Sequence, residues 1–397
     1  MILVFELNWS GTVHAPGNAA TVQTIAAGCP GQAIRFYAEP GHLAELRKND
    51  VLAGLAQVTY HAAAIHPAFQ GRPGIVDWGR MWHEFTTVRA ALADVPRGEP
   101  CLVMMISTTA TGIAAAALAA GRRPDTYVQI GLHGDLNDVS GTRSRHPLKR
   151  AFDLFAALHR PWRRLRFLVL EAPIRDELTR LAPAAAMRTD VLPLPINAAE
   201  VPATATRALA APIRFGFVGQ ATEAKGISVF LDIARRMKAR HGAGLEFDVI
   251  GRALPGAILP DATGLIGPIS TDYLSRAEFM RRIAAVHYVF LPLFGGYYRL
   301  AASGALIDAV TWLKPVIAGR VPIAAQWFAE AGDIGALCDD PAAMEAAVEA
   351  IATAPDTAHY AVQVAALRAA RDRRTPAALG AVYAGIVRAF FPALAAR

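Results

Sequence analysis

The 397-residue sequence predicts an α/β protein with two doubly wound domains, each built on a parallel sheet. Short apolar runs of strand length alternate with longer segments of helical periodicity, as they do where helices cover a parallel sheet. This alternation restarts after the Pro-Leu-Pro sequence at 193–195, which predicts a domain boundary between 197 and 212. We therefore expect one domain over 1–200, a second over 201–375, and a terminal helix over 376–397 that packs back on the first domain.

Both halves show the same order of elements. In the first half, strands are expected at 2–7, 33–38, 101–107, 127–130, 167–171 and 191–194, with helices between them, for example at 18–27 and 111–120. In the second half, strands are expected at 213–218, 246–250, around 265, 288–291, 315–318 and 335–337, with helices at 227–240, 275–285 and 304–313. The terminal helix is amphipathic, because Leu379, Tyr383, Ile386 and Phe390 fall on one stripe.

Composition excludes several classes of protein. Hydrophobic residues make up 53% of the chain and charged residues 18%, which is too apolar for a disordered chain. The longest run of small apolar residues, Gly112 to Ala120, is far shorter than the roughly 20 residues that cross a bilayer. Met1 to Phe5 lack a basic leader and are expected to form a strand, not a signal peptide. Three scattered cysteines have no metal-binding spacing, so we expect a cytoplasmic protein.

The formal net charge of +7 is concentrated in one segment. Between Arg143 and Arg166 the chain has eight Lys or Arg residues and one Asp, with Leu148, Phe152 and Phe155 at helical spacing. A basic amphipathic surface of this kind favours anionic lipid headgroups, and hence the inner face of the membrane. The alternative is a solvated helix face whose apolar stripe packs on its own domain. No nucleic-acid motif accompanies the charge, so nucleic acid is not an expected partner.

A first informative junction follows the predicted strand that ends at Val218. The loop from Gly219 to Gly226 combines a tight turn with Lys225, whose ammonium falls near the start of the next helix. A helix start has unpaired N–H groups and a partial positive charge, so this arrangement suits a diphosphate. Taken alone, a glycine-bounded turn with one lysine is also an ordinary surface turn.

A second junction follows the predicted strand at 288–291. Arg299 precedes Ser303 and Gly304, which open a predicted helix, and Asp308 lies one turn further along it. The cation and the helix-start amides favour phosphate. A carboxylate at this position can accept two hydrogen bonds from vicinal hydroxyls, as acidic residues do for nucleotide riboses. The alternative for Asp308 is an acid that only favours the helix dipole.

In this order, the segments resemble the donor domain of GT-B glycosyltransferases, especially glycosyltransferase family 4. The matching segments are Phe217-Val218-Gly219, Lys225-Gly226, Phe247 to Gly251, Ile266-Gly267-Pro268, Leu291-Pro292 and Ile307-Asp308-Ala309 before Lys314 to Ala318. The resemblance covers most of residues 213–340. It implies two Rossmann-like domains that face each other across a cleft, with a nucleotide diphosphate sugar as the donor.

The resemblance also implies roles for single residues. Lys225 beside Gly219, and the amides near Ser303-Gly304, would contact the donor diphosphate, and Asp308 stands where the family usually has a glutamate that grips the ribose. Two positions depart from the family pattern. Leu300 replaces a second glutamate, and Gln220 lies where an arginine or lysine is common. Our hypothesis is that Arg299 replaces the lost cation.

The first half is less similar to the family. The segment 129–135 follows a predicted strand and resembles the family's acceptor-domain loop, in which a histidine touches the donor sugar. We therefore expect His133 and Asp135 at the catalytic centre. The loop at 8–18, after the first strand, is expected at the same cleft, where its glycines let backbone amides approach phosphate or sugar. The alternative is that His133 is a plain loop residue.

The resemblance implies a retaining hexosyl- or related transferase that moves a sugar to a hydroxyl of a glycan or lipid-linked acceptor, in cell-surface polysaccharide synthesis. Charge develops on the departing diphosphate, so preset cations and helix dipoles are needed, and no metal or other cofactor is expected. A sugar-nucleotide epimerase and a noncatalytic sugar-nucleotide-binding protein stay open as alternatives. A nicotinamide dehydrogenase is disfavoured, because no Gly-x-Gly-x-x-Gly follows the first strand.

Overall fold

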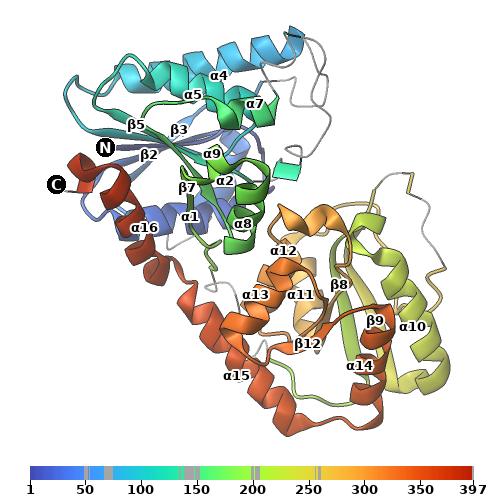
Figure 1. Cartoon of the computed structure of the whole chain (residues 1–397). Coiled ribbons are helices and arrows are strands. Elements are labelled where there is room, and N and C mark those ends of the chain that lie inside the picture. The colour runs from blue at the N-terminus through green and yellow to red at the C-terminus, as the bar shows by residue number, and fades with distance from the viewer. Residues whose placement is uncertain are drawn as a thin grey trace. The chain divides into compact units, whose positions relative to one another are not determined.

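The computed structural model describes residues 1–48, 52, 54–66, 75–133, 136–137, 147, 153–197, 201, 206–254, 256–257 and 261–395. The chain divides into unit 1, Met1–Asn197 with Arg374–Arg397, and unit 2, Ala198–Arg373. Each unit is a parallel sheet covered by helices (Figure 1), which confirms the predicted fold class. Within the described part, no helix combines the length and the apolar character needed to cross a membrane.

Unit 1 is built on a seven-stranded sheet with the order β3-β2-β1-β4-β5-β6-β7. The strands are β1 (Ile2–Glu6), β2 (Ile34–Ala38), β3 (Val58–Ala62), β4 (Cys101–Ser107), β5 (Thr126–Gly131), β6 (Leu165–Val169) and β7 (Thr189–Val191). The order reverses beside β1, because β2 pairs with one side of it and β4 with the other. In doubly wound sheets, ligands bind beyond the carboxyl ends of the strands at such a switch point.

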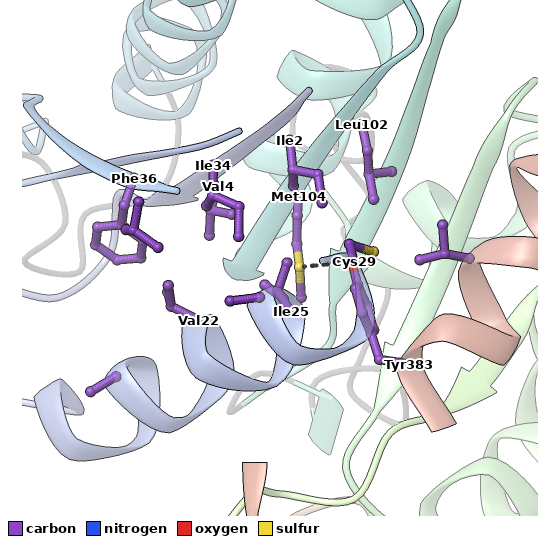
Figure 2. Close-up of a cluster of buried hydrophobic side chains, with 14 of the residues drawn as sticks. Ile2, Val4, Val22, Ile25, Cys29, Ile34, Phe36, Leu102, Met104 and Tyr383 are labelled. Carbon is purple, nitrogen blue, oxygen red and sulfur yellow. Dashed lines mark hydrogen bonds between the residues drawn. The ribbon is translucent and has the colours of Figure 1, made fainter. Parts of the chain in front are cut away.

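The helices of unit 1 come from both ends of the chain. They are α1 (Ala15–Gly28), α2 (Pro40–Arg47), α4 (Ile75–Ala93), α5 (Ala110–Ala120), α7 (Leu154–His159), α8 (Ala172–Leu181), α9 (Pro183–Ala186), α16 (Pro376–Phe390) and α17 (Pro392–Ala395). Helices α1 and α16 meet at two glycines, since a Cβ on Gly28 would lie 2.6 Å from the carbonyl oxygen of Gly380. Tyr383 reaches from α16 into the core formed by β1, β2, β4 and α1 (Figure 2).

Unit 2 has a five-stranded sheet with the order β12-β11-β10-β8-β9. The strands are β8 (Ile213–Ala221), β9 (Leu245–Ala253), β10 (Tyr288–Leu291), β11 (Val316–Gly319) and β12 (Gly335–Cys338). The helices are η4 (Glu223–Lys225), α10 (Ile227–His241), η5 (Gly242–Gly244), α11 (Arg276–Ala285), η6 (Gly296–Arg299), α12 (Gly304–Thr311), α13 (Pro322–Ala331), α14 (Pro341–Thr353) and α15 (Thr357–Arg373). The switch point of this sheet lies between β8 and β10, which pair directly.

Local sequence explains how several elements begin. Ser303, Asp340 and Thr375 each accept a hydrogen bond from an amide in the first turn of the helix that follows, respectively α12, α14 and α16. Every residue of β1 and β10 is buried, which explains the apolar sequence of β10 and of β1 as far as Phe5.

Several strand predictions differ from the structure. The strand expected at 167–171 begins and ends two residues earlier, as β6, because Glu171 instead precedes α8 as its N-cap residue. The strand expected at 191–194 likewise lies earlier, as β7. Around 265 there is only a single bridge, between Leu265 and Phe247. β3 was not predicted, because it is a half-exposed edge strand without a continuous apolar run.

Candidate functional site

The two junctions singled out in the sequence open at the same edge of unit 2. β8 and β10 are neighbours in the sheet, and Phe217 pairs with Phe290 near the carboxyl end of β10. The turn after β8 carries Lys225, and the segment after β10 leads to Ser303. Parallel neighbours end at the same edge, so both junctions lie at the switch point, where doubly wound sheets bind ligands.

Gly226 brings the two junctions into direct contact. It has a left-handed φ of 75°, and a Cβ there would lie 2.3 Å from the carbonyl oxygen of Pro292, just after β10. No side chain fits in that space, so only glycine lets the lysine-bearing turn pack on the segment after β10. On the same side, a Cβ on Gly295 would lie 3.9 Å from the carbonyl oxygen of Ala224.

Lys225 ends η4 and is partly buried. Its ammonium lies beside β8, since a Cβ on Gly219 would be 3.3 Å from Nζ. Burial lowers the pKa of Lys225, and the carboxylate of Asp308 opposes that fall. Among the described residues, none accepts a hydrogen bond from this ammonium. A partly buried cation in this setting is well suited to bind an anion.

Asp308 shares this neighbourhood from the second turn of α12. Burial raises the pKa of its carboxyl to about 6, and the positive charges of Arg276 and Lys225 oppose the rise. The structure therefore brings together the lysine and the acid that were singled out for the diphosphate and the ribose. A carboxylate beside two cations can accept hydroxyl hydrogen bonds while the cations face phosphate.

The start of α12 offers backbone donors next to these side chains. Ser303 is buried, and its Oγ accepts a hydrogen bond from the Leu306 amide at 3.2 Å. Because the amides of Leu306 and Ile307 already donate to the side chain and the carbonyl of Ser303, the backbone amides of Gly304 and Ala305 are the groups left for an anion. Gly304 is exposed, and a Cβ there would meet no atom within 4 Å. The first turn of α12 is therefore open to a ligand.

The proposed replacement cation, Arg299, stays a prediction. It lies at the end of η6 with an exposed side chain, and the cations that act on the Asp308 carboxyl are Arg276 and Lys225. Leu300 is only 4% exposed, so the place of the family's second acid belongs to the core of unit 2. Arg276 was not predicted. A helix that precedes a strand of a parallel sheet starts at the carboxyl edge, and this rule would have indicated the first residue of α11.

A further unpredicted cation lies beside Gln220. Arg252 of β9 pairs in register with Gln220 of β8, and its guanidinium lies 3.7 Å from the centre of the Tyr273 ring. Its Nε is buried and has no hydrogen-bond partner among the described residues. The residue directly after Gly219 is Gln220 and not a cation, but the neighbouring strand supplies a cation, Arg252, at the same level of the sheet.

A cavity of about 360 Å³ lies elsewhere in unit 2, between the start of β8 and the end of α11. Its guanidinium groups are already paired, because Arg282 contacts Asp248, Arg281 contacts Glu278 and Arg214 contacts Glu246. An anion would have to compete with those carboxylates. The carboxyl edge with Lys225 is therefore the better candidate for an anionic ligand.

In unit 1, His133 follows β5 and meets a second histidine. Its Nε2 lies 3.1 Å from Nδ1 of His14, which precedes α1 with a left-handed φ of 60°. The ring of His14 also stacks on Trp9, with centroids 4.7 Å apart. Burial lowers the pKa of His133 and that of His14, the latter to about 4, so both rings are neutral at pH 7. Asp135 lies outside the described residues.

Comparisons with known proteins find solved structures only. No protein-family model matches the sequence, and no curated protein matches it significantly. A structure described as "Trehalose-6-phosphate from E. coli bound with UDP-2-fluoro glucose" is 11% identical with a TM-score of 0.64, covering 98% of both chains. HepE from Anabaena, in complex with UDP-glucose, is 15% identical with a TM-score of 0.62, covering 98% of this chain and 99% of that one.

A third structure is an α,α-trehalose-phosphate synthase (UDP-forming) from Burkholderia xenovorans with glucose-6-phosphate. It is 12% identical with a TM-score of 0.60, and the match covers 98% of this chain and 99% of that one. At such low identity these likenesses show a shared fold, the two-domain GT-B fold of glycosyltransferases. They do not single out glycosyltransferase family 4.

Proposed function

We propose that the protein is a glycosyltransferase that binds a nucleotide diphosphate sugar at the carboxyl edge of unit 2. The observation that carries this proposal is the ammonium of Lys225, which lies beside Gly219 with no acceptor among the described residues. The open start of α12 and the carboxyl of Asp308 lie at the same edge. The UDP-sugars bound in similar structures support a UDP-sugar as the donor.

In this proposal, the chain's own charges stabilise the leaving group. Breaking the bond between sugar and diphosphate puts negative charge on the β-phosphate and positive character on the anomeric carbon. Lys225, Arg276 and the first amides of α12 would stabilise that phosphate charge in the transition state. His133, neutral beside His14, would contact the sugar. A similar structure concerned with glycosyl transfer "with retention" supports a retaining outcome.

The experiment that tests the function is a transfer assay. The purified chain is incubated with UDP-, GDP- and ADP-sugars and a panel of glycan and lipid-linked hydroxyl acceptors, without added metal. We expect release of the nucleoside diphosphate that depends on an acceptor. A new sugar nucleotide formed without acceptor would indicate the epimerase instead. Tight binding without turnover would indicate a noncatalytic binder, which the buried Leu300 in place of an acid favours.

The pKa of Asp308 predicts a pH dependence of donor binding. A ribose needs the ionised carboxylate as acceptor, and burial raises this pKa to about 6. Protonation should therefore weaken binding as the pH falls through 6, by up to about tenfold at pH 5. UDP-glucose is the suitable ligand, because its diphosphate diester does not titrate in this range. Calorimetry should show the loss in the wild type and a weak, pH-independent affinity in Asp308→Asn.

Asp308→Glu is the matched control for this prediction. The resemblance implies a glutamate at this position, so this variant should keep most of the affinity and move the pH midpoint. If Asp308→Asn binds UDP-glucose as tightly as the wild type at pH 7.5, the carboxylate of Asp308 does not contact the donor.

We further propose that the acceptor is a glycan or a lipid-linked sugar in cell-surface polysaccharide synthesis, used at the inner face of the membrane. Part of the basic segment between Arg143 and Arg166, residues 143–146 and 148–152, lies outside the described residues. Its described end includes α7 and Trp162, whose ring lies 5.6 Å below the guanidinium of Arg160. Binding to vesicles with anionic lipid, lost in high salt and absent with neutral lipid, tests this proposal.

A further inference from the structure

A chain of buried polar side chains lies at the switch point of unit 1. It centres on Glu6, the last residue of β1, which is fully buried. Ser107, the last residue of β4, places its Oγ 2.8 and 2.7 Å from the two carboxyl oxygens. Burial raises the pKa of Glu6 to about 7, against hydrogen bonds from Ser107, Asn8 and Asn18. A carboxyl buried at such cost, at a ligand-binding edge, calls for an explanation.

The direction of the hydrogen bonds follows from one backbone carbonyl. Nδ1 of His42 lies 2.9 Å from the carbonyl oxygen of Gly11, which can only accept, so Nδ1 carries the proton. Burial lowers the pKa of His42, so the ring is neutral at pH 7 and accepts at Nε2. Nδ2 of Asn18 lies 3.0 Å from that nitrogen and 3.1 Å from Oε2 of Glu6. Turning the Asn18 amide around would set its oxygen against acceptors.

Glu6 consequently faces a donor at each oxygen. Asn18 Nδ2 donates to Oε2, and the backbone N–H of Asn8 donates to Oε1 at 2.9 Å. Only the hydroxyl of Ser107 can either donate or accept, so it accommodates both the ionised and the protonated carboxyl. An amide in place of the carboxyl cannot be accommodated in this way. Its second N–H would point at another donor.

These bonds fix the segment between β1 and α1 at three points. Asn8 is bound to Glu6, Gly11 to His42, and Asn18 of α1 to both of those side chains. The amide of Gly11 also donates to the Glu39 carboxylate at 3.3 Å. The segment held in this way carries Trp9 and His14.

We propose that Glu6 is a positioning residue, whose carboxyl holds the segment after β1 so that His14 stays in contact with His133. His14 adopts a left-handed backbone conformation, which non-glycine residues rarely take without support from their surroundings. The hydrogen-bonded side chains around Glu6 supply that support for the backbone, and the stacked ring of Trp9 supplies it for the His14 side chain. The positioning of His14 by Glu6 does not depend on the proposed function; only the expected effect of Glu6 on sugar transfer rests on it.

The test compares Glu6→Gln with the wild type by amide hydrogen exchange and by ¹⁵N NMR of the histidine side chains. Gln is isosteric, so we expect a folded protein in which the backbone amides at 8–17, Pro16 excepted, exchange about tenfold faster, the effect of one buried hydrogen bond. The side-chain signals of His14 and His133 should shift. Where transfer is measurable, kcat should fall while the donor KM stays unchanged.

Glu171→Gln is the matched control, because Glu171 is an equally buried carboxylate in unit 1 that binds Arg374 instead. It should leave exchange at 8–17 and both histidine signals unchanged. Wild-type exchange rates in Glu6→Gln would overturn the proposal. If Glu6→Gln does not fold, ¹⁵N NMR of the wild type still tests the proposal. A His42 ring protonated on Nε2 would contradict the hydrogen-bond directions given above and would overturn it. A loosened segment in a protein without transferase activity would leave this inference standing and refute the proposed function.

Discussion

Replacing Lys225 by alanine is expected to weaken the binding of UDP and UDP-glucose about 30- to 100-fold, the effect of losing one charge-assisted contact to a diphosphate. The free energy of unfolding should not fall. The ammonium has no hydrogen-bond acceptor among the described residues, and burial lowers its pKa, so the folded protein gains little from the charge without a ligand. A specific loss of affinity in a fully stable variant is therefore the expected signature. Isothermal titration calorimetry at pH 7.5 measures it.

Lys238→Ala is the matched control for Lys225→Ala. Lys238 lies on α10 in the same unit, but its ammonium donates to the carbonyl oxygen of Leu245 at 2.8 Å. Its removal should leave nucleotide affinity unchanged. Titrations with GDP and ADP identify the base that the site prefers. If the wild type binds UDP-glucose and Lys225→Ala binds it equally tightly, the diphosphate does not lie at this turn.

Much of unit 2 could be predicted from its sequence because its elements are locally encoded. The strand expected at 288–291 coincides with β10, which is buried along its whole length and therefore apolar without interruption. The junctions at Gly219 to Gly226 and at Ser303-Gly304 were predicted from glycines and a helix-capping serine, which act on their own neighbours in sequence. Parallel topology then brings both to one edge of the sheet.

The parts of the site that were not predicted depend on contacts between distant segments. Arg252 lies beside Gln220 only because β9 pairs with β8. The charge of Arg276 acts on Asp308 only because α11 starts at the same edge. The pairing of β9 with β8 is not visible in a window of sequence, and the place of Arg276 follows only from the order of the helices and strands along the chain. The same holds for Glu171, which was expected in a strand but lies after β6 and binds Arg374, 203 residues further along the chain.

That ion pair gives the second large prediction. Replacing Glu171 by alanine is expected to lower the free energy of unfolding of unit 1 by about 3–5 kcal/mol, because Arg374 would stay buried without its counter-charge. The side chains are 1% and 7% exposed, and two hydrogen bonds of 2.5 and 2.9 Å join them. Burial removes the water that would otherwise compensate the guanidinium. Urea denaturation followed by circular dichroism measures the loss.

Glu177→Ala controls for the helix, since Glu177 lies on α8, the helix that follows Glu171, and pairs with Arg180 at the surface. Water can solvate Arg180 when its partner is lost, so we expect no measurable change. Replacing Glu171 and Arg374 together by methionine should restore most of the stability, because no buried charge is then left unpaired. Destabilisation as large in the double variant as in Glu171→Ala would mean that packing, and not the unpaired charge, is responsible. If the double variant is as stable as expected, the ion pair contributes specificity at the place where the chain returns to unit 1, where the carbonyl oxygen of Arg374 also accepts a hydrogen bond from the backbone N–H of Ile196 at 2.8 Å.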